Sequence, residues 1–243
     1  MSTVAAMVCS LHAHSGKTLL ARVLAEHFIL SGSAPLIFDT DALERRLAAC
    51  FADAVVVDLT TVPEQMILFD SLASPSPAPR VVDVAHQTAR PFLKLLRETN
   101  LIAEARANGI VPVLFYIADR DRRSREEGVA LREAFDDCRI VVVENEFLPR
   151  PNAMLRAGDA CRTLGAHPLR VTMPRLADDL TELIEDPGCS LSSLISAPLS
   201  RNDQRGDLSF DAALAFRAWL MPLFRDIHRA LANLEAEVEA MAD

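Results

Sequence analysis

The chain has 243 residues, half of them hydrophobic, and carries a formal net charge of −9. A chain of this size buries a substantial core as one domain of α/β size, and its acidic charge excludes bulk binding to nucleic acid, so any such contact needs a local basic patch. No CxxC pair occurs among its cysteines, which disfavours zinc centres and disulfide frameworks and fits a reducing cytoplasm.

The amino-terminal stretch MSTVAAMVCS lacks the basic segment of a secretory signal peptide. No apolar run approaches the roughly 18 residues that a membrane span needs. We therefore expect a cytoplasmic protein with no membrane partner.

Short apolar runs alternate with longer helical patterns along the chain. Near-continuous apolar runs are typical of strands that are buried on both faces. The expected strands are 4–9, 34–39, 54–59, 80–84, 110–117 and 139–143, with a weaker one at 169–172. The expected helices are 17–30, 41–50, 63–73, 90–108, 122–135 and 176–185. This alternation predicts an α/β fold, a mostly parallel sheet with helices on both faces, in which ligands bind at the carboxyl ends of strands.

Two parts are expected, residues 1–199 as the ligand-binding domain and residues 200–243 as a helical extension. The extension carries one apolar stripe at helical spacing. The stripe comprises Phe216, Leu220, Leu223, Ile227, Leu231, Leu234, Val238 and Met241. It either packs on the body of the domain or serves for association, and its acidic end disfavours a basic membrane anchor.

The stretch SLHAHSGKT at 10–18 joins the first strand to the first helix. Backbone N–H groups at a helix N-terminus hold phosphates, and in such loops a lysine reaches the terminal phosphates while the next hydroxyl binds magnesium. Gly16, Lys17 and Thr18 supply these parts, but Leu11 stands where the full pattern has its first glycine. The alternative is an ordinary strand-to-helix turn.

His12 and His14 also permit a metal interpretation of the loop. No acidic or cysteine ligand is nearby in the sequence to complete such a site, so we favour two polar loop residues. Beside a bound phosphate, either histidine would add hydrogen-bond donors.

Several predicted strands end in aspartate, which is the residue type that organises magnesium at a nucleotide site. Asp39 and Asp41 follow the second strand, Asp58 the third and Asp83 the fourth. Each has the alternative role of a helix N-cap or turn aspartate. Spacing does not choose between Asp58 and Asp83.

The order of these motifs resembles the ParA/MinD group of P-loop ATPases, and the lengths are closest to its TraL-like branch, found with conjugation and plasmid genes. The resemblance rests on the GKT triplet and on the segments FDTDA, VVDVA and VVVEN, which end or follow predicted strands. It implies a P-loop NTPase fold, ATP and Mg²⁺ as ligands, and a homodimer.

The resemblance also implies roles for single residues. Lys17 and Asp41 would be catalytic, with Asp41 positioning the attacking water. Thr18, Asp39 and Asp83 would organise the magnesium, and the helix predicted after Asp83 favours it over Asp58 as the Walker B aspartate. Asn145 would read the adenine edge. The residues expected to line the nucleotide are His12, Ala13, His14, Ser15, Gly16, Lys17, Thr18, Asn145 and Pro174.

The loop departs from the family pattern K-G-G-x-G-K-[ST] at three positions. His12 stands in place of the signature lysine, which normally reaches the partner's nucleotide across the dimer, and Ala13 and His14 replace glycines. A histidine is shorter and only partly charged near neutrality. Nucleotide binding is therefore better supported than hydrolysis.

An arginine-rich stretch follows the fifth predicted strand. Its members are Arg120, Arg122, Arg123 and Arg125, interleaved with acidic residues. It is either a self-paired surface or a contact for DNA phosphates or a protein partner.

Three functions are open at this point. The first is a ParA/TraL-like ATP-dependent switch linked to DNA partition, conjugation or protein positioning. The second is a small-molecule P-loop kinase or ligase, although no arginine-rich lid is evident. The third is a non-catalytic interaction module that retains the fold.

Overall fold

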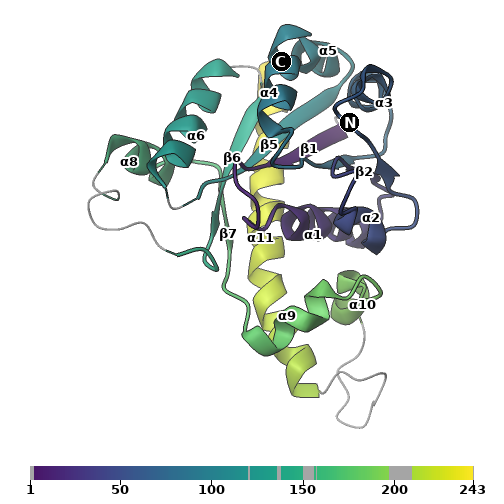
Figure 1. Ribbon diagram of the computed structural model, residues 1–243, viewed down its shortest axis with the longest axis vertical. Helices are drawn as coiled ribbons and strands as arrows, with labels where there is room; N and C mark the ends of the chain where they lie inside the picture. Colours follow the sequence, from purple (N-terminus) through teal and green to yellow (C-terminus); the bar gives the residue numbers. More distant parts are fainter. Residues whose placement is uncertain are drawn as a thin grey trace.

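A computed structural model describes residues 3–119, 121–135, 138–149, 156, 158–196 and 210–242 (Figure 1). The strands are β1 (Thr3–Cys9), β2 (Leu36–Asp39), β3 (Val55–Val56), β4 (Arg80–Asp83), β5 (Ile110–Ile117), β6 (Arg139–Asn145) and β7 (Arg170–Met173). The helices are α1 (Lys17–Leu30), α2 (Arg46–Cys50), α3 (Val62–Ala73), α4 (Ala89–Glu98), α5 (Leu101–Ala107), α6 (Arg122–Ala134), α8 (Asp159–Gly165), α9 (Asp178–Glu185), α10 (Leu191–Ser196) and α11 (Phe210–Ala242).

The described strands form one sheet in the order β3-β2-β4-β1-β5-β6-β7, and every neighbouring pair is parallel. This confirms the predicted α/β fold. β1 lies at the centre of the sheet. Strands β2 to β4 lie on one side of it and β5 to β7 on the other, so the strand order reverses at β1. In open α/β sheets a crevice forms at such a switch point, at the carboxyl ends of the strands. The loop after β1 therefore lies where this fold places ligands.

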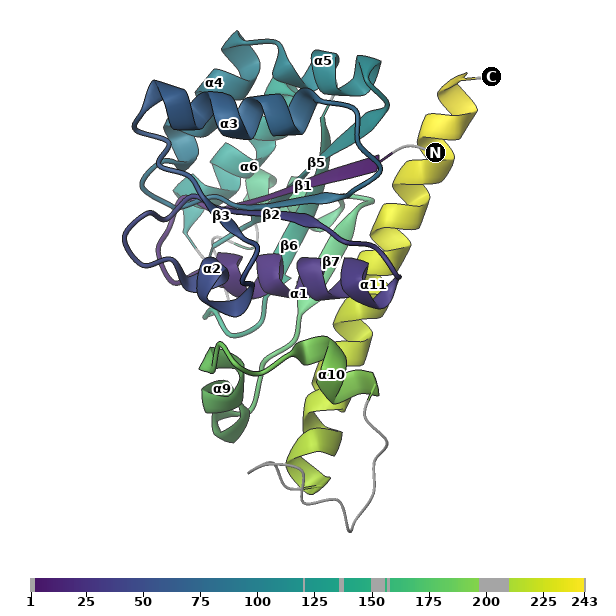
Figure 2. The same cartoon turned by 90° about the vertical axis from the view of Figure 1, so that its right-hand side faces the viewer.

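Helices cover both faces of the sheet, as Figure 2 shows. Because side chains alternate along a strand, β1 contributes Val4, Ala6 and Val8 to a core shared with α1 and α11. The alternate residues, from Ala5 to Cys9, enter a second core under α3, α4 and α5. Both faces of β1 are buried, which explains its uninterrupted apolar sequence.

The long helix α11 packs on the body of the domain. The first six residues of the predicted stripe, from Phe216 to Leu234, are buried in the same core as α1 and β7. The side chains of Val238 and Met241 and the proposed boundary at 199/200 lie outside the described residues. Within the described ranges no helix combines the length and apolar character that a bilayer crossing requires.

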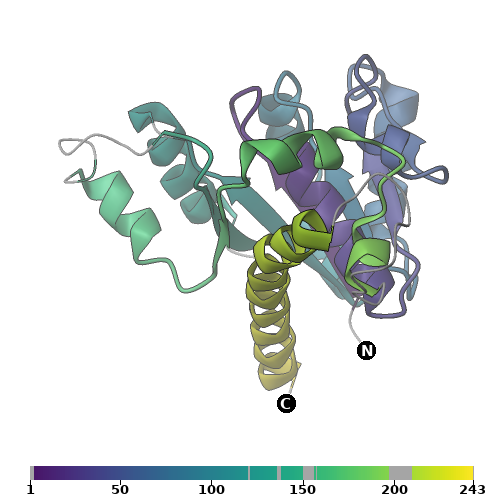
Figure 3. The ribbon, with the colours of Figure 1, turned by 90° about the horizontal axis from the view of Figure 1, so that it is seen from below.

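A buried polar link joins α1 to the segment between α9 and α10. Arg22 donates to the backbone carbonyls of Ile184, Asp186 and Cys189, and Glu26 accepts the amide hydrogens that open α10. Both side chains are almost fully buried. Figure 3 shows this carboxyl-terminal part of the chain crossing the face of the sheet that α1 covers.

Two predicted helices differ from the structure. The prediction of a continuous helix at 90–108 is wrong, because Asn100 adopts φ 56° and separates α4 from α5. Asparagine tolerates this left-handed conformation better than most residues, so it permits the break. The helix predicted at 41–50 is reduced to α2, since the preceding residues form a turn.

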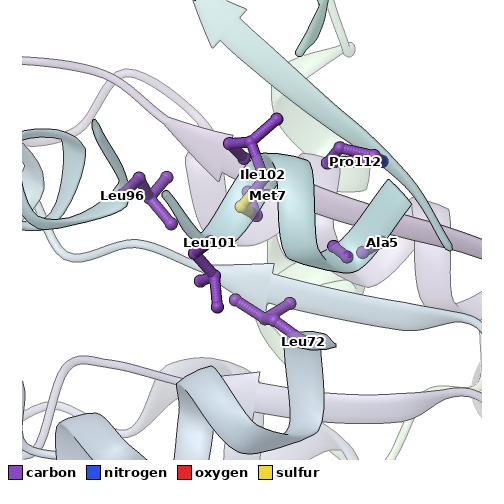
Figure 4. A pocket seen from close by; sticks show the side chains of 8 residues that line it. Ala5, Met7, Leu72, Leu96, Leu101, Ile102 and Pro112 are labelled. Carbon is purple, nitrogen blue, oxygen red and sulfur yellow. The ribbon is translucent and has the colours of Figure 1, made fainter. Parts of the chain in front are cut away.

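A small apolar cavity of about 10 Å³ lies between the sheet and the helices of the second core (Figure 4). Its lining includes Met7, Leu72, Leu101 and Ile102. A water molecule needs polar partners to occupy such a space, and a larger ligand does not fit. The cavity is a packing gap and not a ligand site.

Candidate functional site

The loop from Ser10 to Gly16 leaves the carboxyl end of β1 and opens directly into α1. His14 and Gly16 both adopt positive φ, 54° and 94°. A Cβ atom on Gly16 would lie 2.7 Å from Nδ2 of Asn145. Both the backbone conformation and this close approach therefore require glycine at position 16. At position 14 the same kind of conformation is held by a histidine.

Lys17 is folded back onto its own loop. Its Nζ donates to the backbone carbonyl of His12 at 2.9 Å, and the residue is only 8% exposed. Burial lowers the pKa of Lys17, while the nearby carboxylates of Asp83 and Asp41 act in the opposite direction. The loop thus places a buried amine beside acidic groups at the N-terminus of a helix.

Asp83 lies at the end of β4, the strand beside β1, and faces Thr18. The Thr18 hydroxyl donates to Oδ2 of Asp83 at 2.6 Å. The other carboxylate oxygen, Oδ1, is buried and has no hydrogen-bond partner among the described residues. Burial raises the pKa of Asp83 to about 7, although the Thr18 hydrogen bond lowers it. A buried, unsatisfied oxygen of this kind is costly unless a ligand completes it.

Asp58, the alternative to Asp83 as the magnesium-organising aspartate, follows β3, a strand at the edge of the sheet. Its Oδ1 accepts hydrogen bonds from the amide and hydroxyl of Thr60. These bonds lower the pKa of Asp58. The geometry therefore gives Asp58 the role of a turn aspartate and brings Asp83 to the loop.

Asp39 and Asp41 hold the turn after β2. The buried Asp39 accepts three backbone hydrogen bonds, from the amides of Asp41, Leu47 and Ala48. Burial raises the pKa of Asp39, and these amides lower it. The half-exposed Asp41 accepts from the next amides of the turn. Both carboxylates therefore serve as local caps in this structure, which is the alternative that the sequence left open.

Asn145 and Pro174 lie on the other side of the loop, at the ends of β6 and β7. Nδ2 of Asn145 donates to the carbonyl of Ser15 at 3.0 Å, and its Oδ1 accepts from the amide of Phe147. The carbonyl of Pro174 accepts from the indole of Trp219 at 2.8 Å. Asn145 is thus a contact of the loop itself, and its expected role toward a base stays a prediction.

Three further residues near the loop were not predicted from the sequence as site residues. Asp119 and Asp121 come after β5 and flank the His12 ring, and His86 lies three positions after Asp83. Burial and the charge of Lys17 lower the pKa of His86. The signal that could have identified Asp119 and Asp121 is the order of strands in the sheet. Because β5 pairs with β1, the connection after β5 lies beside the loop after β1.

The arginine-rich stretch does not form a single exposed patch. Arg125 is 5% exposed and lies 3.5 Å from Sγ of Cys161, so its inclusion in a surface patch is wrong. Arg122 is paired with Glu126 one turn along α6. Arg123 is exposed, and Arg120 lies outside the described residues. The pairing of Arg122 favours the self-paired interpretation.

Neither a protein-family model nor a curated protein sequence matches the chain. Among solved structures, the MinD cell division protein of Aquifex aeolicus is similar, with 15% sequence identity and a TM-score of 0.43. The match covers 90% of this chain and 97% of that protein.

Proposed function

We propose that the chain binds ATP with Mg²⁺ at residues 10–18 and acts as a ParA/TraL-like nucleotide-dependent switch. The observation that carries the proposal is the Thr18–Asp83 pair with its unsatisfied buried oxygen, beside the buried amine of Lys17. Hydroxyl, carboxylate and amine are the groups that hold a magnesium ion and a triphosphate. They meet at the N-terminus of α1, where the helix dipole favours an anion.

The loop can hold Mg²⁺ and ATP if the Lys17 amine moves from its present acceptor to the phosphates. Thr18 and Asp83 would hold the magnesium, which supplies charge neutralisation for the phosphates when bound. Lys17 would exchange the His12 carbonyl for phosphate oxygens, because its amine is held by this neutral acceptor and only weakly, at 3.5 Å, by the Ser15 hydroxyl. Backbone amides at the start of α1 would complete the cradle.

The catalytic part of the proposal assigns Asp41 to positioning the attacking water. Its carboxylate already influences the pKa of both Lys17 and Asp83, so it lies within electrostatic reach of the loop. Asp39 is better suited to holding the turn that carries Asp41 than to contacting the metal. With His12 in place of a lysine, we propose slow turnover.

The finer part of the proposal is a homodimer that engages DNA or a protein partner in plasmid partition, conjugation or protein positioning. It is supported by the order of motifs along the chain, which resembles that of the ParA/MinD group. In this order FDTDA and VVDVA each include the end of a strand, and both strands lie on the same side of β1. Phosphate release, measured with and without a second macromolecule, distinguishes a switch from a module that only binds nucleotide.

The test is isothermal calorimetry of Mg²⁺–ATP binding to wild type, Lys17→Ala and Lys94→Ala. Lys94 is an exposed lysine on α4 paired with Glu98, and serves as the matched control. Loss of a charge-assisted contact to phosphate predicts at least about 100-fold weaker binding for Lys17→Ala. Lys94→Ala should bind like wild type. Equal affinity of Lys17→Ala and wild type would overturn the proposal.

A further inference from the structure

We propose that His12, Asp119 and Asp121 form a second metal site that takes a divalent transition ion of the Zn²⁺, Co²⁺ or Ni²⁺ class. The site joins the loop after β1 to the connection between β5 and α6. None of its residues belongs to the Thr18–Asp83 pair, and His12 is part of the loop proposed to bind ATP, so the site is tested without nucleotide.

The geometry brings three ligands together from two distant parts of the chain. Nδ1 of His12 lies 3.5 Å from Oδ2 of Asp119, and Nε2 lies 3.2 Å from Oδ2 of Asp121. One ligand atom from each residue can be chosen so that all three lie within 4.8 Å of one another. Ligands around a zinc ion at bond lengths near 2.1 Å are separated by roughly 3.4 Å, so the His12–carboxylate distances are close to the spacing that one ion needs.

A shielded nitrogen atom of the His12 ring provides a second argument. Nδ1 of His12 is shielded from solvent and has no hydrogen-bond partner among the described residues. A neutral imidazole carries one N–H and one lone pair. With carboxylate oxygens at both nitrogens, the neutral ring therefore always directs a lone pair at an acceptor. A metal ion at the unprotonated nitrogen would replace this repulsive contact with one bond to the nitrogen and one to a carboxylate oxygen, while the other nitrogen keeps its proton.

The donor set selects the class of ion. Imidazole nitrogen with carboxylate oxygen suits zinc and its neighbours in the first transition row, whereas magnesium and calcium prefer oxygen alone. Asp121 is also the N-cap of α6, since its Oδ1 accepts from the amide of Ser124. This bond fixes the carboxylate that faces His12, as a hydrogen bond to a metal ligand does in established sites.

The position of the site gives it a consequence for the loop. The backbone carbonyl of His12 is the acceptor that holds Nζ of Lys17. An ion bound to the His12 ring would fix this residue and so favour the folded-back position of Lys17. A bound transition ion should therefore stabilise the ligand-free form of the loop.

The experiment uses the full chain after treatment with a chelator, without nucleotide. Calorimetry with Zn²⁺ and visible absorption with Co²⁺ are recorded for wild type, His12→Gln and Asp121→Asn, in an excess of Mg²⁺. Asparagine retains the N-cap of α6, so the second variant keeps the helix while changing the ligand. His14→Gln is the control, because it removes the neighbouring exposed histidine of the same loop.

Wild type and His14→Gln should each bind one ion, with the absorption bands of nitrogen- and oxygen-coordinated Co²⁺. Each ligand variant should bind at least about 10-fold more weakly. Absence of wild-type binding at an ion concentration on the order of 100 μM would overturn the proposal and leave His12 in an ion pair only. Unchanged affinity in both ligand variants, or loss of binding in His14→Gln alone, would overturn it equally.

Discussion

At the scale of single residues, two positions of the loop have a left-handed backbone conformation, and only one of them is glycine. His14 and Gly16 both have positive φ, yet only Gly16 also lacks room for a side chain. The requirement for glycine at position 16 was predictable from the GKT motif. The strain at His14 was not, because no local pattern fixes the conformation of a loop whose shape depends on Asn145, a residue distant in sequence.

We expect His14→Gly to stabilise the protein by about 1 kcal/mol, since glycine adopts positive φ without the steric cost that a Cβ imposes. Ala13→Gly is the matched control, because Ala13 lies in the same exposed loop without positive φ. There glycine only adds conformational entropy to the unfolded chain and should lower stability slightly. Urea unfolding checks both changes, and a loss of stability in His14→Gly would contradict the expectation.

At the scale of elements, the sequence predicted the strands well because each lies between two helical layers and is largely apolar. It failed where an element ends through a contact with a distant residue. The start of α2 depends on Asp39, whose carboxylate accepts from amides eight and nine residues later. The pairing of His12 with Asp119 and Asp121 likewise exists only once β1 and β5 are neighbours.

The connection between α3 and β4 is held by one fully buried arginine. Arg80 donates to the carbonyls of Ser71, Ser74, Ser76 and Ala78, and so closes the proline-rich turn around its guanidinium. Burial lowers the pKa of Arg80, so these bonds offset the cost of its desolvation.

Arg80→Met should destabilise the protein by about 3 kcal/mol, because methionine replaces only the aliphatic part of arginine and leaves these carbonyls without their donor. The control is Arg97→Met, at an exposed position of α4. Chemical unfolding should show a lower midpoint for the first variant and a nearly unchanged one for the second. A loss below about 1 kcal/mol for Arg80→Met would show that water replaces the guanidinium at these carbonyls.

At the scale of the whole molecule, the helix that begins at the loop also holds the carboxyl-terminal part of the chain. Arg22 binds the segment before α10, and Glu26 binds the first amides of α10. His27 lies against Phe224 and His228 of α11. The apolar stripe predicted α11, but its partner on α1 was not predictable, since many helix faces in one chain are apolar enough to receive it.

The contact of α1 with α11 should be sensitive to acid. Burial and the neighbouring His228 lower the pKa of His27 to about 4, below its ordinary value of 6.5. The unfolded chain therefore binds a proton that the folded protein does not as the pH falls from 6.5 to 4, and stability decreases in that window. Because His27 is partly exposed to solvent, we expect this loss of stability to be about 1 kcal/mol.

Replacing His27 with leucine should remove this part of the pH dependence. Thermal unfolding at pH 4.5 and 7 would measure the difference between the two proteins, and the wild type should lose more stability on acidification. The raised pKa of Asp83 acts in the opposite direction over the same window, but it is common to both proteins and cancels in the comparison. Parallel profiles for the two proteins would contradict the assignment to His27.

The contact between the end of β7 and α11 connects the single tryptophan to the loop. The chain has a single tryptophan, and its indole is bonded to the carbonyl of Pro174, directly after Met173. The Met173 side chain in turn lies next to Gly16, 3.4 Å from where a Cβ would be. Entry of a ligand into the loop would disturb this short chain of contacts, so we expect the fluorescence emission of Trp219 to change on binding without any attached label.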